Sequence, residues 1–139
     1  MMVSQGKAAV KSGQKLEDAV ERILKSYDLS YCKQAKFTDI YENPRSKMDF
    51  YVENFDLGIE CKRQNVGGTA DQKMPFVVKN LERFPAKNGL LVIDGDHYKA
   101  RTGIHAYLNS EKCDTFDWIF LDALEDWLLE QTKNRTTIK

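Results

Sequence analysis

Three ionisable side chains lie close together on two short strand-like segments near the middle of the chain. The first segment, "MDFYVEN", carries Asp49 near its start, and the second, "LGIECKRQ", carries Glu60 and Lys62. A short turn separates the segments, so we expect them to pair as a hairpin. Side chains alternate across a strand, which places Glu60 and Lys62 on one face of the second strand.

Two carboxylates and one ammonium in this arrangement favour metal-assisted hydrolysis of a phosphodiester. Asp49 and Glu60 would be near neighbours, with Cβ atoms roughly 5 to 8 Å apart, and would repel each other or share a proton. Mg²⁺ prefers carboxylate and carbonyl oxygens, so the cation would relieve the repulsion, with the backbone carbonyl of Cys61 as a further ligand. Lys62 would then orient a water and stabilise charge on a phosphate.

Each of these residues also has a purely structural interpretation. Asp49 could cap a turn, and Glu60 and Lys62 could belong to a solvated strand face. The apolar flanks of Glu60 and Lys62 indicate instead a largely buried strand, where unpaired charges are costly. Cys61 points away from both and is predicted to be a small buried residue.

Bulk composition indicates one soluble globular domain over residues 1–139, with residues 1–11 and 133–139 expected to be flexible. The chain has 21 basic and 21 acidic residues, so net charge alone does not indicate nucleic-acid binding. Three widely spaced cysteines argue against a disulfide framework and predict a reducing, cytoplasmic location. No apolar run is long enough for a membrane span, and no signal peptide is recognisable.

The predicted order of elements is α-β-β-β-α-β-α-β-α. Apolar spacing predicts a first helix over residues 12–27, with Ser12 as its N-cap. A helix is expected over residues 69–84, beginning at Thr69 or, because of Pro75, near Met74. The run "NGLLVIDGD" is typical of a buried strand, followed by a turn at Asp94-Gly95 that would leave His97 in solvent.

Asp49 followed by Glu60-Cys61-Lys62 resembles the PD-(D/E)XK nuclease superfamily. The segment "GQKLE" on the first helix resembles a pattern whose glutamate, here Glu17, often completes the metal site. The element order also matches the αβββαβ core of the superfamily, over roughly residues 12–95. The resemblance implies an α/β, restriction-endonuclease-like fold, in which helices flank a central mixed sheet and the core is followed by a C-terminal αβα unit.

The resemblance also implies roles for residues around the site. Asp49, Glu60, the Cys61 carbonyl and Glu17 would bind Mg²⁺, with Mn²⁺ as a substitute, and Lys62 would assist the attacking water. Glutamate early in a helix is also favoured by the helix dipole, so Glu17 has a structural interpretation of equal weight. A proline that precedes the aspartate in many members is absent here, where Lys47-Met48 stands.

Weaker candidates follow the lysine along the chain. Gln64 would contact DNA or the attacking water. The candidate contacts to the nucleic-acid backbone are Arg63, Gly67, Gly68, Gln72 and Lys73. Each of these has an ordinary alternative as a loop, cap or surface residue. The two histidines do not make a zinc site, and no phosphate-binding GxxxxGK[ST] loop supports a nucleotide cofactor.

The sequence therefore predicts a Mg²⁺-dependent DNA endonuclease that produces 5′-phosphate ends. The chain leaves little room for elements that read bases, which favours a structure-selective, junction-resolvase-like enzyme or a compact endonuclease of a phage or mobile element. Duplex or branched DNA is the expected partner, and a homodimer is expected because a duplex has two strands. The alternatives are a non-catalytic nuclease-fold module that binds nucleic acid or protein, and a nuclease that acts on RNA.

Overall fold

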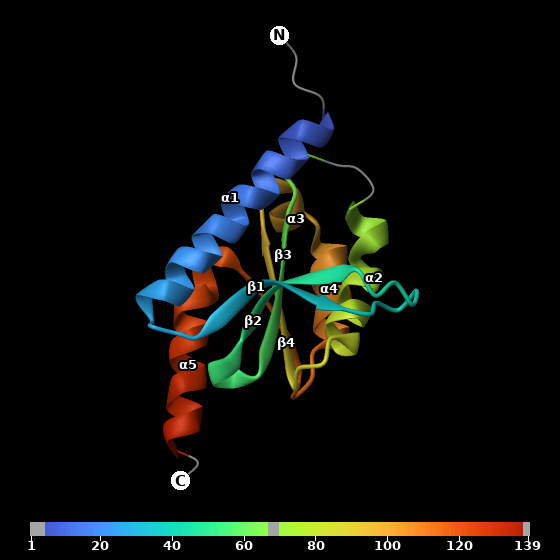
Figure 1. The fold of residues 1–139 in the computed structure, drawn as a ribbon. Helices are drawn as coiled ribbons and strands as arrows, with labels where there is room; N and C mark the ends of the chain where they lie inside the picture. Colours follow the sequence, from blue (N-terminus) through green and yellow to red (C-terminus); the bar gives the residue numbers. More distant parts are fainter. Residues whose placement is uncertain (1–4, 67–69, 138–139) are drawn as a thin grey trace.

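A single mixed sheet organises the chain (Figure 1). The computed structural model describes residues 5–66 and 70–137. The strands lie in the order β1 (Tyr31–Phe37), β2 (Ser46–Val52), β3 (Leu57–Arg63), β4 (Asn88–Asp94) and β5 (Phe116–Phe120). The first three strands pair antiparallel, whereas β3, β4 and β5 pair in parallel. This is the α/β arrangement with a mixed sheet that the sequence predicted.

Helices cover both faces of the sheet. In Figure 1, α1 (Gln5–Ser26) and α5 (Leu124–Thr137) lie against one face, and α2 (Ala70–Arg83) and α4 (Thr102–Glu111) lie against the other. Two 3₁₀ turns, Glu53–Phe55 and Leu121–Ala123, complete the connections. None of the described helices is long and apolar enough to cross a membrane.

Strand β4 shows how the sequence pattern builds two cores. Its residues from Leu90 to Ile93 are all buried, as the apolar run predicted. Alternation sends Leu90 and Val92 into the cluster beneath α1 and α5, and Leu91 and Ile93 into the cluster beneath α2 and α4. Strand β4 is thus buried on both faces, which is typical of parallel pairs.

The β1–β2 hairpin contributes to both cores. Near the end of β2, Phe50 and Val52 pack with α1 and α5. Nearer the turn, Met48 and Phe37 pack with α2 and α4. The inner face of the hairpin therefore passes from one helical layer to the other, and Asp49 lies where it crosses.

Helix α1 is longer at its start than the sequence pattern predicted. Leu16, Val20 and Leu24 form the expected buried stripe, but the helix begins at Gln5, so Ser12 lies inside it and not at its N-cap. Intrinsic propensities of Ser and Gly are a weak prior, and helix continuity overrides them here.

The segment after β4 also differs from the prediction. Gly95 does break the chain, with φ of 102°, but a short helix, α3 (Asp96–Ala100), follows immediately. His97 therefore lies in a helix, and its side chain is only 12% exposed. Helix α2 already includes Ala70 and contains Pro75, so a start near Met74 is wrong, whereas the predicted start at Thr69 lies outside the described residues.

Gly58 leaves room for an aromatic ring of the core beneath α2 and α4. A Cβ atom at this position of β3 would lie 2.7 Å from Cδ2 of Phe84. We expect Gly58→Ala to destabilise the fold by about 1–3 kcal/mol through overpacking. Urea unfolding of Gly103→Ala, where a Cβ meets nothing within 4 Å, is the matched control and should show no loss. Equal stability of the two variants would contradict this account.

Candidate active site

The site forms where β2 and β3 part. The ladder between the two strands includes Phe50 opposite Ile59. One residue beyond this pair, the side chain of Asp49 takes the place of a backbone carbonyl as the acceptor for an N–H group of β3. Its Oδ2 accepts a hydrogen bond of 2.8 Å from the backbone N–H of Cys61. This bond fixes the Asp49 carboxylate in the notch between the two strands.

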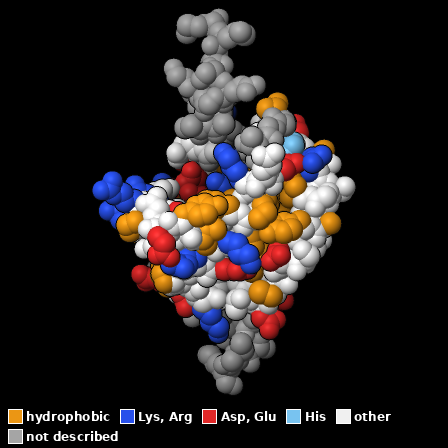
Figure 2. All heavy atoms as spheres, turned by 90° about the vertical axis from the view of Figure 1, so that its right-hand side faces the viewer, with side chains coloured by type: hydrophobic (Ala, Val, Ile, Leu, Met, Phe, Trp, Pro, Cys, Tyr) orange, Lys and Arg blue, Asp and Glu red, His pale blue; other side chains and the backbone are white. Residues whose placement is uncertain are grey.

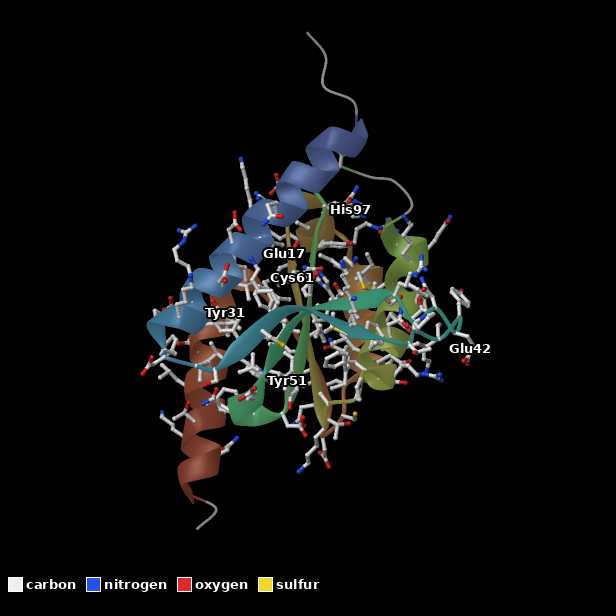
Figure 3. All side chains as sticks on the ribbon, in the orientation of Figure 1. Glu17, Tyr31, Glu42, Tyr51, Cys61 and His97 are labelled. Atoms are coloured by element: carbon white, nitrogen blue, oxygen red, sulfur yellow. The ribbon has the colours of Figure 1, made fainter. Side chains whose placement is uncertain are left out.

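Two more carboxyl groups meet Asp49 in this notch. Glu60 comes from β3 and Glu17 from α1, and each lies within hydrogen-bonding reach of the Asp49 side chain. Figure 3 shows Glu17 beside Cys61, where α1 crosses the sheet. The expected proximity of Asp49 and Glu60 is thus present, and Glu17 joins them from the other layer.

The pKa values of Glu60 and Glu17 are raised by burial and by the neighbouring Asp49 carboxyl group. Burial raises the pKa of Glu60 well above its ordinary value, and the hydrogen bond and negative charge of Asp49 add to it, while Lys62 acts in the opposite direction. The pKa of Glu17 rises to about 7, first because of burial and then because of Asp49. The cluster therefore holds protons near neutral pH unless another cation takes their place.

Gln34 is a member of the cluster that sequence reasoning missed. Its side-chain amide donates a hydrogen bond of 3.0 Å to Oε1 of Glu17, and its backbone has a positive φ of 54°. The β1–β2 register, with Lys33 opposite Phe50 and Ala35 opposite Met48, sets Gln34 opposite Asp49. A glutamine in a polar strand carries no signal of such a role until the register is known.

Lys62 lies on the same face of β3 as Glu60. The two residues stand opposite Leu91 and Ile93 of β4, which point toward the α2 and α4 layer. Among the described residues, the Lys62 ammonium has no hydrogen-bond or ion-pair partner, and its charge acts on Glu60. Cys61 is buried as predicted, and burial raises the pKa of its thiol, which keeps it protonated.

The weaker candidates lie away from the carboxylates or are otherwise engaged. The Gln64 amide donates to the backbone oxygen of Val66 at 2.6 Å, and so closes its own turn. Arg63 pairs with Asp94 at 3.5 Å, on the face opposite to Lys62. Gln72 and Lys73 are exposed on α2, whereas Gly67 and Gly68 lie outside the described residues.

A second polar cluster, not predicted, joins α2 to the segment after β4. Asp71 contacts Nε2 of His97 at 2.6 Å and accepts a hydrogen bond of 2.8 Å from Nε of Arg101. The hydrogen bond from His97 and then that from Arg101 lower the pKa of Asp71. The backbone N–H of His97 donates to the Gln64 carbonyl, so this cluster anchors the first turn of α2 beside the end of β3.

The oxygen ligands and the shortage of positive charge in the notch fit a hard divalent cation. Asp49 and Glu60 supply carboxyl oxygens, and the pKa of Glu60 is raised. Backbone carbonyl oxygens are further ligands of the kind that such a cation prefers. Although Glu17 approaches Asp49, no group of three or more His, Cys, Asp or Glu side chains within the described ranges is arranged so that it could hold a metal ion, so the structure does not bring Glu17 into a three-carboxylate ligand set. A metal here would therefore depend on two carboxylates together with backbone or water oxygen.

The comparison with protein families agrees with this geometry. A family model described as a PD-(D/E)XK nuclease superfamily domain matches residues 8–117. The five-stranded mixed sheet with flanking helices is consistent with a restriction-endonuclease-like fold. The chain therefore belongs to the PD-(D/E)XK nuclease superfamily. No curated protein and no solved structure matches it.

Proposed function

We propose that this protein is a Mg²⁺-dependent DNA endonuclease whose catalytic groups are Asp49, Glu60 and Lys62. The observation that carries the proposal is the meeting of the Asp49 and Glu60 carboxyl groups beside a lysine without a partner among the described residues. A nuclease fold and a nucleic-acid substrate follow from the family; the metal, the DNA preference and the residue roles are the proposal.

Asp49 and Glu60 would hold the cation, and Cys61 would add its carbonyl oxygen. In an extended strand, the N–H and C=O of one residue point to the same neighbour. The Cys61 N–H points to Asp49, so its carbonyl also faces the notch. A bound Mg²⁺ polarises the scissile phosphate and lowers the pKa of a water.

Lys62 would position the attacking water and stabilise charge on the phosphate as the P–O bond breaks. The products are a 5′-phosphate and a 3′-hydroxyl. Glu17, with its raised pKa, would release its proton when the cation binds. Gln34 would hold the Glu17 carboxyl in place through its 3.0 Å hydrogen bond.

The test is cleavage of supercoiled plasmid, a four-way junction and a flap with Mg²⁺, Mn²⁺ or chelator. Asp49→Asn is the informative variant, because its side-chain oxygen still accepts from the Cys61 N–H and the fold is kept. We expect metal-dependent nicking by the wild type and none by the variant. Binding without cleavage under every condition would favour a non-catalytic module, and cleavage of RNA alone would reassign the substrate.

We further propose that the enzyme acts as a homodimer. One site cuts one strand, so two copies related by two-fold symmetry would address both strands of a duplex. Sedimentation equilibrium with and without DNA measures this directly. A monomer in both conditions would leave single-strand nicking as the activity.

A further inference from the structure

The loop over residues 38–45 is built around one buried carboxylate. Asp39 is 5% exposed and accepts hydrogen bonds from the backbone N–H groups of Tyr41 and Asn43 and from the Ser46 hydroxyl, at 2.8, 3.1 and 2.6 Å. Three donors on one carboxylate fix the backbone of the loop. The tip of the β1–β2 hairpin is therefore preorganised.

The same loop is attached to α2. The backbone N–H of Ile40 donates to Oδ1 of the buried Asn80 at 3.1 Å, and Glu42 pairs with Arg83 at 3.4 Å. These contacts hold the loop against one face of the helix. They also set the position of the aromatic residue between them.

That residue, Tyr41, presents one ring face to solvent. Its other face stacks on Phe76 of α2, with ring centroids 5.1 Å apart and an interplanar angle of 19°. Tyr41 is nevertheless 75% exposed. A large aromatic ring held rigidly at the surface can stack on a second flat ring. Proteins that bind single-stranded nucleic acid use exposed aromatic side chains in this way, as platforms for the bases.

Four basic residues lie along the hairpin and on the neighbouring turn of α2. Lys36 and Lys47 stand directly opposite each other across the hairpin, an arrangement that is unfavourable for like charges. Arg45 lies in the loop, and Lys73 lies one turn before Phe76 on α2. In the described part of the chain, none of these four side chains has a hydrogen-bond or ion-pair partner. Figure 2 shows apolar side chains interspersed with both basic and acidic side chains on the face that carries α2 and this loop.

The hairpin connects this surface to the carboxylates. Lys47 and Asp49 are two residues apart, and buried Met48 lies between them. Both therefore point to the same face, separated along the strand by about 7 Å. This spacing is comparable to that of neighbouring phosphates along a nucleic-acid strand, so a strand with one phosphate at Asp49 would bring the next to the lysine pair.

We propose that Tyr41, backed by Phe76, stacks on an unpaired base while Lys36 and Lys47 bind the phosphates between that base and the cleavage site. This inference rests on the proposed function and gives its substrate class: DNA with unpaired nucleotides beside the cut, either single-stranded or branched. A continuous duplex offers no free base to the ring.

The test is binding of labelled DNA in chelator, where cleavage does not interfere. Fluorescence anisotropy would compare a single strand of about 16 nucleotides with the matching duplex, for the wild type, Tyr41→Phe and Tyr41→Leu. Leucine keeps apolar volume but has no flat π face. We expect Tyr41→Leu to weaken single-strand binding roughly tenfold, with little change for duplex and little change in Tyr41→Phe.

A second readout reports stacking itself. A fluorescent purine analogue in the single strand should be quenched by the wild type and by Tyr41→Phe, but not by Tyr41→Leu. Lys36→Ala and Lys47→Ala should each reduce the slope of log affinity against log salt concentration by an amount close to one phosphate contact. Lys87→Ala, just before the start of β4, should leave this slope unchanged.

The outcomes separate this inference from the proposed function. Normal cleavage with equal affinity and equal quenching in Tyr41→Leu would overturn the stacking surface and leave the nuclease standing. Quenching that depends on Tyr41 in a protein that cuts nothing would retain the binding surface and overturn the nuclease. The melting temperatures of Tyr41→Leu and Tyr41→Phe are measured first. Binding is then measured at a temperature below both unfolding transitions, so that a difference in stability does not affect the comparison.

Discussion

Lys62→Met is expected to lower the rate of DNA cleavage by about 10²–10³-fold, the loss typical of removing one charge-stabilising donor from an active site. Methionine keeps the length of the side chain and loses only the ammonium. Among the described residues, Lys62 has no hydrogen-bond or ion-pair partner that maintains the fold. The change should therefore act on the chemical step, measured by single-turnover cleavage at saturating Mg²⁺.

Two variants serve as controls for that result. Lys87→Met removes a lysine exposed at the far end of β4 and should cleave at the wild-type rate. Lys62→Arg keeps the charge but changes its geometry, so partial activity is expected. A Lys62→Met enzyme with unchanged single-turnover rate would remove the lysine from the mechanism, while a lower melting temperature would show that its role is structural.

The largest expected effect on stability is a gain from Mg²⁺ that increases with pH. Glu17 has a folded pKa of about 7 against an ordinary value of 4.5, and the pKa of Glu60 is raised as well. For an acid with a raised pKa, the folded state holds the proton more tightly than the unfolded chain does. For Glu17 this contribution is complete below pH 4.5 and is lost as pH rises through about 7.

Without metal, the melting temperature should therefore fall as pH rises from 5 to 8, by about 3–5 °C for each kcal/mol lost. Glu17 is partly solvated, so screening reduces its share of the effect. At pH 8 fewer protons compete with the cation, and Mg²⁺ at 100 times its Kd adds about 2.7 kcal/mol, or roughly 10 °C. At pH 5 protons compete with the metal, and the gain should be smaller.

Glu60→Gln is the control for both parts of this prediction. It removes one titrating ligand, so the melting temperature should depend less on pH and the gain from Mg²⁺ should be lost. The pKa values of Asp39 and Asp71 are lowered, so their contributions disappear only at acid pH below 3.8 and do not enter this window. An equal gain from Mg²⁺ in Glu60→Gln would place the metal elsewhere.

The sequence was sufficient to predict which carboxylates meet, because Asp49 and Glu60 lie at similar distances from one short turn. Local pairing rules act over such short separations, and they also place Lys62 beside Glu60. The contact of Glu17 with Asp49 was harder to predict, because it depends on how α1 crosses the sheet. It was predicted from family resemblance and not from spacing.

Residues that meet through tertiary packing were not predictable in the same way. Asp71 and His97 lie 26 positions apart, and the sequence indicated only a turn for the histidine. Gln34 reaches Glu17 because its backbone adopts a positive φ inside a strand, which no propensity of glutamine favours. Arg63 and Gln64 were proposed from adjacency to the lysine, yet alternation and the turn after β3 direct them to Asp94 and Val66.

The passage of the β1–β2 hairpin from one helical layer to the other has a consequence for how the protein can be divided. Phe37 and Met48 belong to one core, and Phe50 and Val52 belong to the other. Neither layer can be removed without exposing half of this hairpin, so no fragment holding a single layer would fold by itself. A graft that transfers the carboxylates to another scaffold would have to carry both layers, and new sequence is best inserted at surface turns such as that between α4 and β5.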